Sequence, residues 1–130
     1  MSSARLSLAR APGGVRRARH FLAGQLASWG LERLRPRLEL AISELVTNAV
    51  THGRGDVEVE VRCEDGSVHA EVTDHGGGRP VVQDKADLGE PGGWGLRLVS
   101  EVADDWGTTI TPTTTTVWLR LAIPTPALGG

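Results

Sequence analysis

The chain has 130 residues and a formal net charge of −2, a length suited to one compact domain. This near-neutral charge argues against a protein that binds nucleic acid or an anionic membrane through a global positive field. The single cysteine, Cys63, excludes an internal disulfide framework and a multi-cysteine metal site. No stretch approaches the roughly 18 apolar residues of a membrane span, and the N-terminus lacks the apolar core of a signal peptide. We therefore expect a soluble, cytoplasmic protein without direct nucleic-acid or membrane partners.

Residues 1–13 mix serine, alanine and arginine and end in proline and glycine, which predicts a flexible N-terminal arm. Apolar residues then recur at helical spacing from Val15 to Trp29, and Gly30 supplies a stop, so a first amphipathic helix is expected there. The other face of this helix is basic. It can be a solvated face, or it can contact an acidic partner or phosphates.

A second helix is predicted to open at Pro36, which suits a first helical turn, and to close at Gly53 in a left-handed cap. Two runs with alternating apolar residues follow at 57–64 and 68–74, joined by Asp65 and Gly66. An Asp-Gly pair between alternating runs favours a tight hairpin turn. We expect an antiparallel hairpin with one face on the helices.

Residues 75–93 are rich in glycine, proline and charge and predict a long loop, after which helical spacing continues to Trp106. Two strands are expected at 107–111 and 116–123, and residues 125–130 form a tail. This order favours an α+β fold, a two-layer sandwich with helices on one face of a mostly antiparallel sheet. The predicted domain covers residues 14–124.

Three short segments carry candidate chemistry. On the second helix, Glu44, Asn48 and His52 follow one another at four-residue steps along the border of the apolar half. Such a line of side chains often does no more than reach water. It gains meaning only from the other two segments.

The second segment is Asp74 with the glycines behind it, Gly76 to Gly78. A carboxylate there can accept a hydrogen bond from an exocyclic amine, and glycines let a flat ring or phosphates approach the backbone. The third segment, residues 92–96, is glycine-rich and starts a helix, where free N–H groups and the helix dipole favour anionic oxygens. Each segment alone is weak evidence for a binding site, since glycine-rich strings of this kind often form only turns. No P-loop or dinucleotide motif is present, and the histidines lack metal-ligand spacing.

In this order, E-x-x-x-N-x-x-x-H-G, D-x-G-G-G and G-x-G-L resemble the ATP-binding domain of gyrase, heat-shock chaperone ATPases, histidine kinases and mismatch-repair ATPases. More narrowly, VRRARHFLAGQLASWGL, ELAISELVTNAVTHG, DHGGGRP, GGWGLRLV and TVWLRL resemble the bacterial anti-sigma-factor serine/threonine kinases, in the style of the small actinobacterial members, over nearly the whole chain. The resemblance implies the Bergerat ATP-binding fold, ATP and Mg²⁺ as ligands, and a sigma factor and an anti-sigma-factor antagonist as partners. It implies phosphorylation of a serine or threonine of the antagonist, and a homodimer is possible.

The resemblance also assigns roles to residues. Glu44 matches the general base, Asn48 the Mg²⁺ ligand and Asp74 the residue that recognises the adenine amino group. The remaining matches are glycines that clear the approach of the ring or underlie the phosphates, their neighbours, and a threonine near the adenine: Gly76, Gly78, Gly93, Trp94, Gly95, Leu96 and Thr116. Residues 81–92 match a lid over ATP, and the role of His52 is open.

Two departures from the family pattern keep an alternative open. Trp94 stands where a basic residue is common between the paired glycines, so charge for the terminal phosphate must come from elsewhere, with Lys85 and Arg97 as candidates. The threonine run 113–116 replaces the usual glycine before the last strand. The alternative is a non-catalytic module whose bound ATP or ADP controls partner binding. A free-standing half of a histidine kinase fits less well, because no dimerisation helix with a phosphoacceptor histidine is present.

Overall fold

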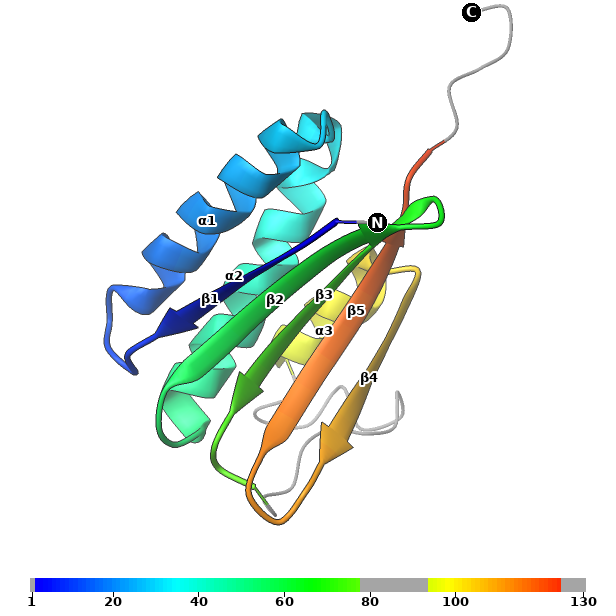
Figure 1. Cartoon of the computed structure of the whole chain (residues 1–130). Helices are drawn as coiled ribbons and strands as arrows, with labels where there is room; N and C mark the ends of the chain where they lie inside the picture. The colour runs from blue at the N-terminus through cyan, green and yellow to red at the C-terminus, as the bar shows by residue number, and fades with distance from the viewer. Residues whose placement is uncertain (1, 78–93, 125–130) are drawn as a thin grey trace, which may run out of the picture.

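The computed structural model describes residues 2–77 and 94–124, and for residues 94–96 the backbone alone. It contains a five-stranded sheet in the order β1-β2-β3-β5-β4, with every neighbouring pair antiparallel. The helices lie together on one face of this sheet (Figure 1). The predicted α+β two-layer sandwich is therefore confirmed. The elements are β1 (Ser2–Leu8), α1 (Gly14–Ser28), the 3₁₀ turn η1 (Glu32–Leu34), α2 (Arg35–His52), β2 (Val57–Glu64), β3 (Ser67–Asp74), α3 (Trp94–Val102), β4 (Asp105–Ile110) and β5 (Thr115–Ala122).

The core forms where the apolar residues of the strands meet the helices. In β2 and β3, alternate residues are buried and their neighbours remain partly exposed, as expected for a sheet with one covered face. Leu22 and Leu26 of α1 and Leu38 and Ile42 of α2 are fully buried, and each such side chain contributes about 1.5–3 kcal/mol through burial. Helix α2 lies at the centre of the helical layer, because it packs against both α1 and α3.

The hairpin between β2 and β3 follows the prediction. Asp65 and Gly66 both have positive φ, at 46° and 76°, as a two-residue type I′ turn requires. The register pairs Val59 with Val72 and Val61 with Ala70, so the apolar sets of both strands face the helices. Among the described residues, no helix is both long and apolar enough to cross a membrane.

The prediction of a flexible N-terminal arm was wrong. Ser2–Leu8 is a strand that pairs along its whole length with β2. Leu6 and Leu8 lie opposite Val59 and Val57, and Leu8 is fully buried. The serine and arginine residues that suggested an arm occupy the solvent face and exposed rim of an edge strand, where polar residues are expected.

Two other boundaries also differ from the prediction. Gly53 is not a left-handed cap, since its backbone is extended at φ −87° and ψ −169°. Helix α3 ends at Val102, and Trp106 belongs to β4. Pairing with β5 ends the helical pattern early: the N–H of Asp104 donates to the carbonyl of Arg120, and its carboxylate accepts from the N–H of Ala122.

Candidate functional site

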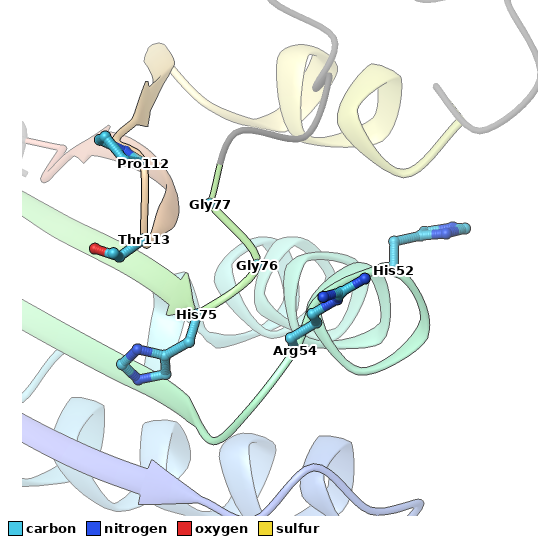
Figure 2. Close-up of a pocket in the computed structure, with 7 residues that line it drawn as sticks. All are labelled: His52, Arg54, His75, Gly76, Gly77, Pro112 and Thr113. Carbon is cyan, nitrogen blue, oxygen red and sulfur yellow. The ribbon is translucent and has the colours of Figure 1, made fainter.

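A cavity of about 620 Å³ lies where α2 and β3 end and β4 turns into β5. In Figure 2, Gly76 and Gly77 run through its middle, Pro112 and Thr113 stand on one side, and His52 and Arg54 stand on the other. His75 completes the lining. The cavity thus brings together His52 from the end of the second helix with Gly76 and Gly77 from the glycine segment, whereas Glu44, Asn48 and Asp74 are not among its lining residues.

A buried polar pair lies beside this cavity. Asp74 and Thr115 are 2% and 1% exposed, and among the described residues they are the buried side chains that are polar or charged. They are direct neighbours across the β3–β5 ladder. Burying a carboxylate is costly unless hydrogen bonds stabilise it, so a buried aspartate at the end of a strand marks a candidate site.

The pair holds Gly76 from both sides. The N–H of Gly76 donates to Oδ1 of Asp74 at 2.7 Å, and Oγ1 of Thr115 donates to the carbonyl of Gly76 at 3.1 Å. Asp74 has further interactions as well. The first turn behind β3 is therefore fixed by side chains of the sheet itself.

The β4–β5 turn packs directly against Gly77 of this segment. A Cβ atom on Gly77 would overlap the backbone nitrogens of Thr113 and Thr114, so this close approach requires glycine. Hydrogen bonds within the turn hold its shape: Oγ1 of Thr111 accepts from the N–H of Thr113 at 3.2 Å and from that of Thr114 at 2.9 Å. The threonine run thus forms a braced turn at the position where the sequence pattern led us to expect glycine.

The second helix places Glu44 and Asn48 at the margin of the core. Both are half-buried, whereas Ala41, Leu45 and Ala49 are buried, as the helical wheel predicts. They are four residues apart, about 6 Å along the axis. His52, the third member of the line, is exposed at the rim of the cavity.

Thr116 does not lie where the sequence analysis expected. Its Oγ1 is 2.8 Å from Oγ1 of Thr73, on the sheet face that carries no helices, and Thr115 takes the place beside Asp74. The missed signal is strand alternation: Leu119 and Leu121 face the core, and counting back by twos reaches Thr115. Thr115 is thus a candidate site residue that the sequence pattern did not reveal.

Several predicted residues cannot be placed in the site. Gly78, Gly93, Lys85 and the predicted lid, residues 81–92, lie outside the described residues. Trp94, Gly95 and Leu96 form the first turn of α3, without described side chains. Arg97, a candidate for contact with the terminal phosphate, pairs with Glu101 at 3.6 Å.

The residues on α2 fit a loosely held Mg²⁺ ion. Within residues 2–77 and 94–124, no three histidine, cysteine or acidic side chains are grouped as metal ligands. Mg²⁺ in nucleotide sites keeps several waters and takes most other ligands from phosphates, with one or two protein oxygens. The amide oxygen of half-buried Asn48 is a donor of that kind, so the donor set agrees with a metal that arrives with a phosphate ligand.

Residues 8–121 match the sequence model of a protein family described as the histidine kinase-like ATPase domain. No curated protein sequence matches the chain. The structure is similar to the crystal structure of the RsbU and RsbW domains of Rv1364c from Mycobacterium tuberculosis, with a TM-score of 0.76 and 25% sequence identity. The match covers 98% of this chain and 34% of that chain, so the chain spans about a third of that structure's length.

A second similar structure is the Acinetobacter baumannii histidine kinase AdeS, with a TM-score of 0.58 and 11% identity, covering 96% of this chain and 70% of that one. At this identity the likeness concerns the fold alone. Both structures agree with the five-stranded antiparallel sheet and one-sided helices described above.

Proposed function

Because this chain belongs to the histidine kinase-like ATPase domain family, we propose that it binds ATP beside Asp74 and phosphorylates a serine or threonine of an anti-sigma-factor antagonist. In the absence of that antagonist, it binds and sequesters a sigma factor. The observation that carries the proposal is the buried carboxylate of Asp74, which is 2% exposed and lies against a glycine segment at the cavity. Because this proposed function uses ATP and a sigma factor, we propose the cytoplasm as the location of the protein.

In this proposal, Asp74 at the end of β3 recognises the adenine base. One carboxylate oxygen of Asp74 accepts the N–H of Gly76, and a carboxylate has lone pairs for further donors. The adenine amino group is such a donor. Gly76 carries no side chain into the space in front of it, so a flat ring can approach the backbone there.

In this proposal, residues of α2 and the first turn of α3 bind the phosphates and take part in phosphate transfer. Mg²⁺, when bound with ATP, supplies positive charge that offsets the charge developing on the phosphates. Asn48 would hold this ion through its amide oxygen. Glu44, one helical turn away, accepts the proton of the attacking hydroxyl group, and the first N–H groups of α3, which begins at Trp94, donate to phosphate oxygens.

The alternative function is a module that binds ATP or ADP without transferring phosphate, with the nucleotide controlling which partner is bound. Trp94 in place of a basic residue favours it, because a terminal phosphate then has to obtain its positive charge from another residue. Arg97 is already paired with Glu101. The presence of Glu44 on the accessible margin of α2 favours the kinase.

Incubation of the protein with γ-labelled ATP, Mg²⁺ and the antagonist encoded nearby separates the two functions. We expect acid-stable label on a serine or threonine of the antagonist. Glu44→Ala is expected to lower transfer by about 10²–10⁴-fold, the usual contribution of a general base, while ATP binding is kept. Glu58→Ala, which removes a glutamate from the other face of the sheet, is the matched control. Tight ATP binding by the wild type without any transfer would rule out the kinase.

A further inference from the structure

Gly53 ends α2 and is followed by the segment that leads into β2. Its backbone angles, φ −87° and ψ −169°, belong to the extended region that any amino acid adopts. The local conformation therefore gives no reason for glycine here. The reason must lie in what surrounds the Cα atom.

The surroundings of Gly53 leave no room for a side chain. A Cβ atom there would lie 2.5 Å from Cγ and 2.7 Å from Oδ2 of Asp74, and 2.5 Å from the carbonyl oxygen of Ala49. Contacts below 3.0 Å are essentially absent for real Cβ atoms. The end of α2 thus packs directly against the carboxylate of Asp74.

The Asp74 carboxylate cannot easily move away from such a contact. Its side chain is 2% exposed, and its other oxygen, Oδ1, holds the N–H of Gly76 at 2.7 Å. The two backbones are also joined, because the N–H of His75 donates to the carbonyl of Arg54 at 2.8 Å. The carboxylate therefore lies between Gly53 on one side and Gly76 on the other.

We propose that Gly53 is a positioning residue that sets the place of the Asp74 carboxylate and so determines the preference of the site for purines that carry a 6-amino group. The proposal rests on the function proposed above for Asp74. A methyl group at position 53 would lie 2.5 Å from Cγ of Asp74, about 0.5 Å inside the 3.0 Å limit, and equally close to the carbonyl oxygen of Ala49, so the carboxylate and the end of α2 have to move apart. Hydrogen bonds weaken steeply outside a narrow range of distance and angle, so this displacement removes most of the discrimination.

The experiment compares two ligands on two proteins by titration calorimetry. ATP and purine riboside 5′-triphosphate differ only in the 6-amino group, so the ratio of their dissociation constants isolates its recognition. We expect the wild type to prefer ATP by roughly tenfold or more, as for one hydrogen bond to a charged group. Gly53→Ala is expected to reduce this preference to within about threefold of unity, with affinity for the purine analogue nearly unchanged.

Two matched glycine variants separate positioning from general damage. Gly55 lies in the same segment with φ at +66°, and a Cβ there meets His75 rather than Asp74, so Gly55→Ala should lower the melting temperature and keep the ATP preference. Gly24→Ala on α1, where a Cβ meets nothing within 4 Å, should change neither. A Gly53→Ala protein that weakens both ligands equally, and so keeps the preference, would overturn the proposal.

Asp74→Glu crowds the same contact by lengthening the acidic side chain instead of adding a methyl group to Gly53. This variant replaces Gly53→Ala in the experiment if Gly53→Ala does not fold. The extra methylene group has to fit into the space between Gly53 and Gly76, so the ATP preference should again be lost. A retained preference in Asp74→Glu would show that Gly53 does not fix the carboxylate. If the wild type itself shows no preference for ATP, the proposed role of Asp74 fails. If the wild type and Gly53→Ala both prefer ATP, the role of Asp74 stands and only the proposed positioning role of Gly53 fails.

Discussion

The sheet end and helix α2 contribute different kinds of side chain to the proposed site. Asp74 and Thr115 are 2% and 1% exposed and are hydrogen-bonded to Gly76. Glu44 and Asn48 are half-buried at the margin of α2. Groups that recognise a fixed shape profit from being held in place by packing, whereas groups that meet a metal or a second substrate must remain accessible. Substitutions at the sheet end should therefore affect both stability and binding, and those of Glu44 and Asn48 should affect chiefly ligand chemistry.

Asp74→Asn should give the largest loss of ATP affinity. The amide has one acceptor and one donor group, so while its oxygen holds the N–H of Gly76, its NH₂ group faces the adenine amino group, donor against donor. Loss of a hydrogen bond to a charged group corresponds to a decrease in affinity of about 10–100-fold. Titration calorimetry measures this change, and thermal unfolding should also report lower stability. Asp56→Asn, at an exposed position, is the control; unchanged affinity in Asp74→Asn would remove Asp74 from the base site.

Asn48→Ala should lower affinity only where Mg²⁺ is present. Loss of one oxygen ligand is expected to weaken ATP binding by roughly tenfold with Mg²⁺ and to leave binding in EDTA unchanged. Because Asn48 is half-buried, the free energy of unfolding should change by less than about 1 kcal/mol. Thr47→Ala, at the exposed neighbouring position, controls for the helix itself. A large loss of stability would contradict the division between the two regions.

Thr115→Val and Thr116→Val should separate the two faces of the sheet. The first removes a buried hydroxyl that donates to Gly76 and should cost about 1–3 kcal/mol of stability together with a few-fold loss of ATP affinity. The second removes a hydroxyl that contacts Thr73 on the opposite face and should cost at most about 1 kcal/mol. It should leave ATP affinity unchanged. Equal effects on affinity would mean that the turn as a whole, rather than Thr115, supports the site.

The sequence predicts well the features that depend on neighbouring residues. The wheel of α2 placed Glu44 and Asn48 at the edge of the core, and their half-burial agrees. The Asp65–Gly66 pair predicted the hairpin, and both residues have positive φ. In each case the pattern repeats within one helix or one turn, so local propensity and hydrophobic periodicity suffice.

The missed features depend on contacts between distant segments. The strand Ser2–Leu8 exists because β2 offers an unpaired edge, which the first residues do not reveal by themselves. The inward face of Thr115 follows from the register of β3 and β5, and four threonines in a row give no sign of it. The need for glycine at position 53 comes from the carbonyl of Ala49 in the same helix and from Asp74, a residue in another layer of the molecule.

The smallest effect is expected at Glu39, in the part of α2 that precedes the site. Hydrogen bonds from Arg35 and Arg19 lower the pKa of Glu39 below its ordinary value of 4.5. A carboxyl group with a lowered pKa stabilises the folded state at pH values above its ordinary value, and this contribution is lost as the pH falls through the folded-state pKa. Both arginines are about half exposed, so water and salt weaken the interaction.

Glu39→Gln should therefore lower the free energy of unfolding by about 0.5–1 kcal/mol at neutral pH, and the difference from the wild type should shrink as the pH falls below 4.5. Chemical denaturation at a series of pH values measures it. Because the interaction joins α1 to α2 and reaches none of the residues beside the cavity, ATP affinity should not change. Glu32→Gln, on η1 at an exposed position, is the control. A fall in ATP affinity in Glu39→Gln would show that packing between the helices sets the positions of Glu44 and Asn48, and that the helix side of the site is as tightly held as the sheet end.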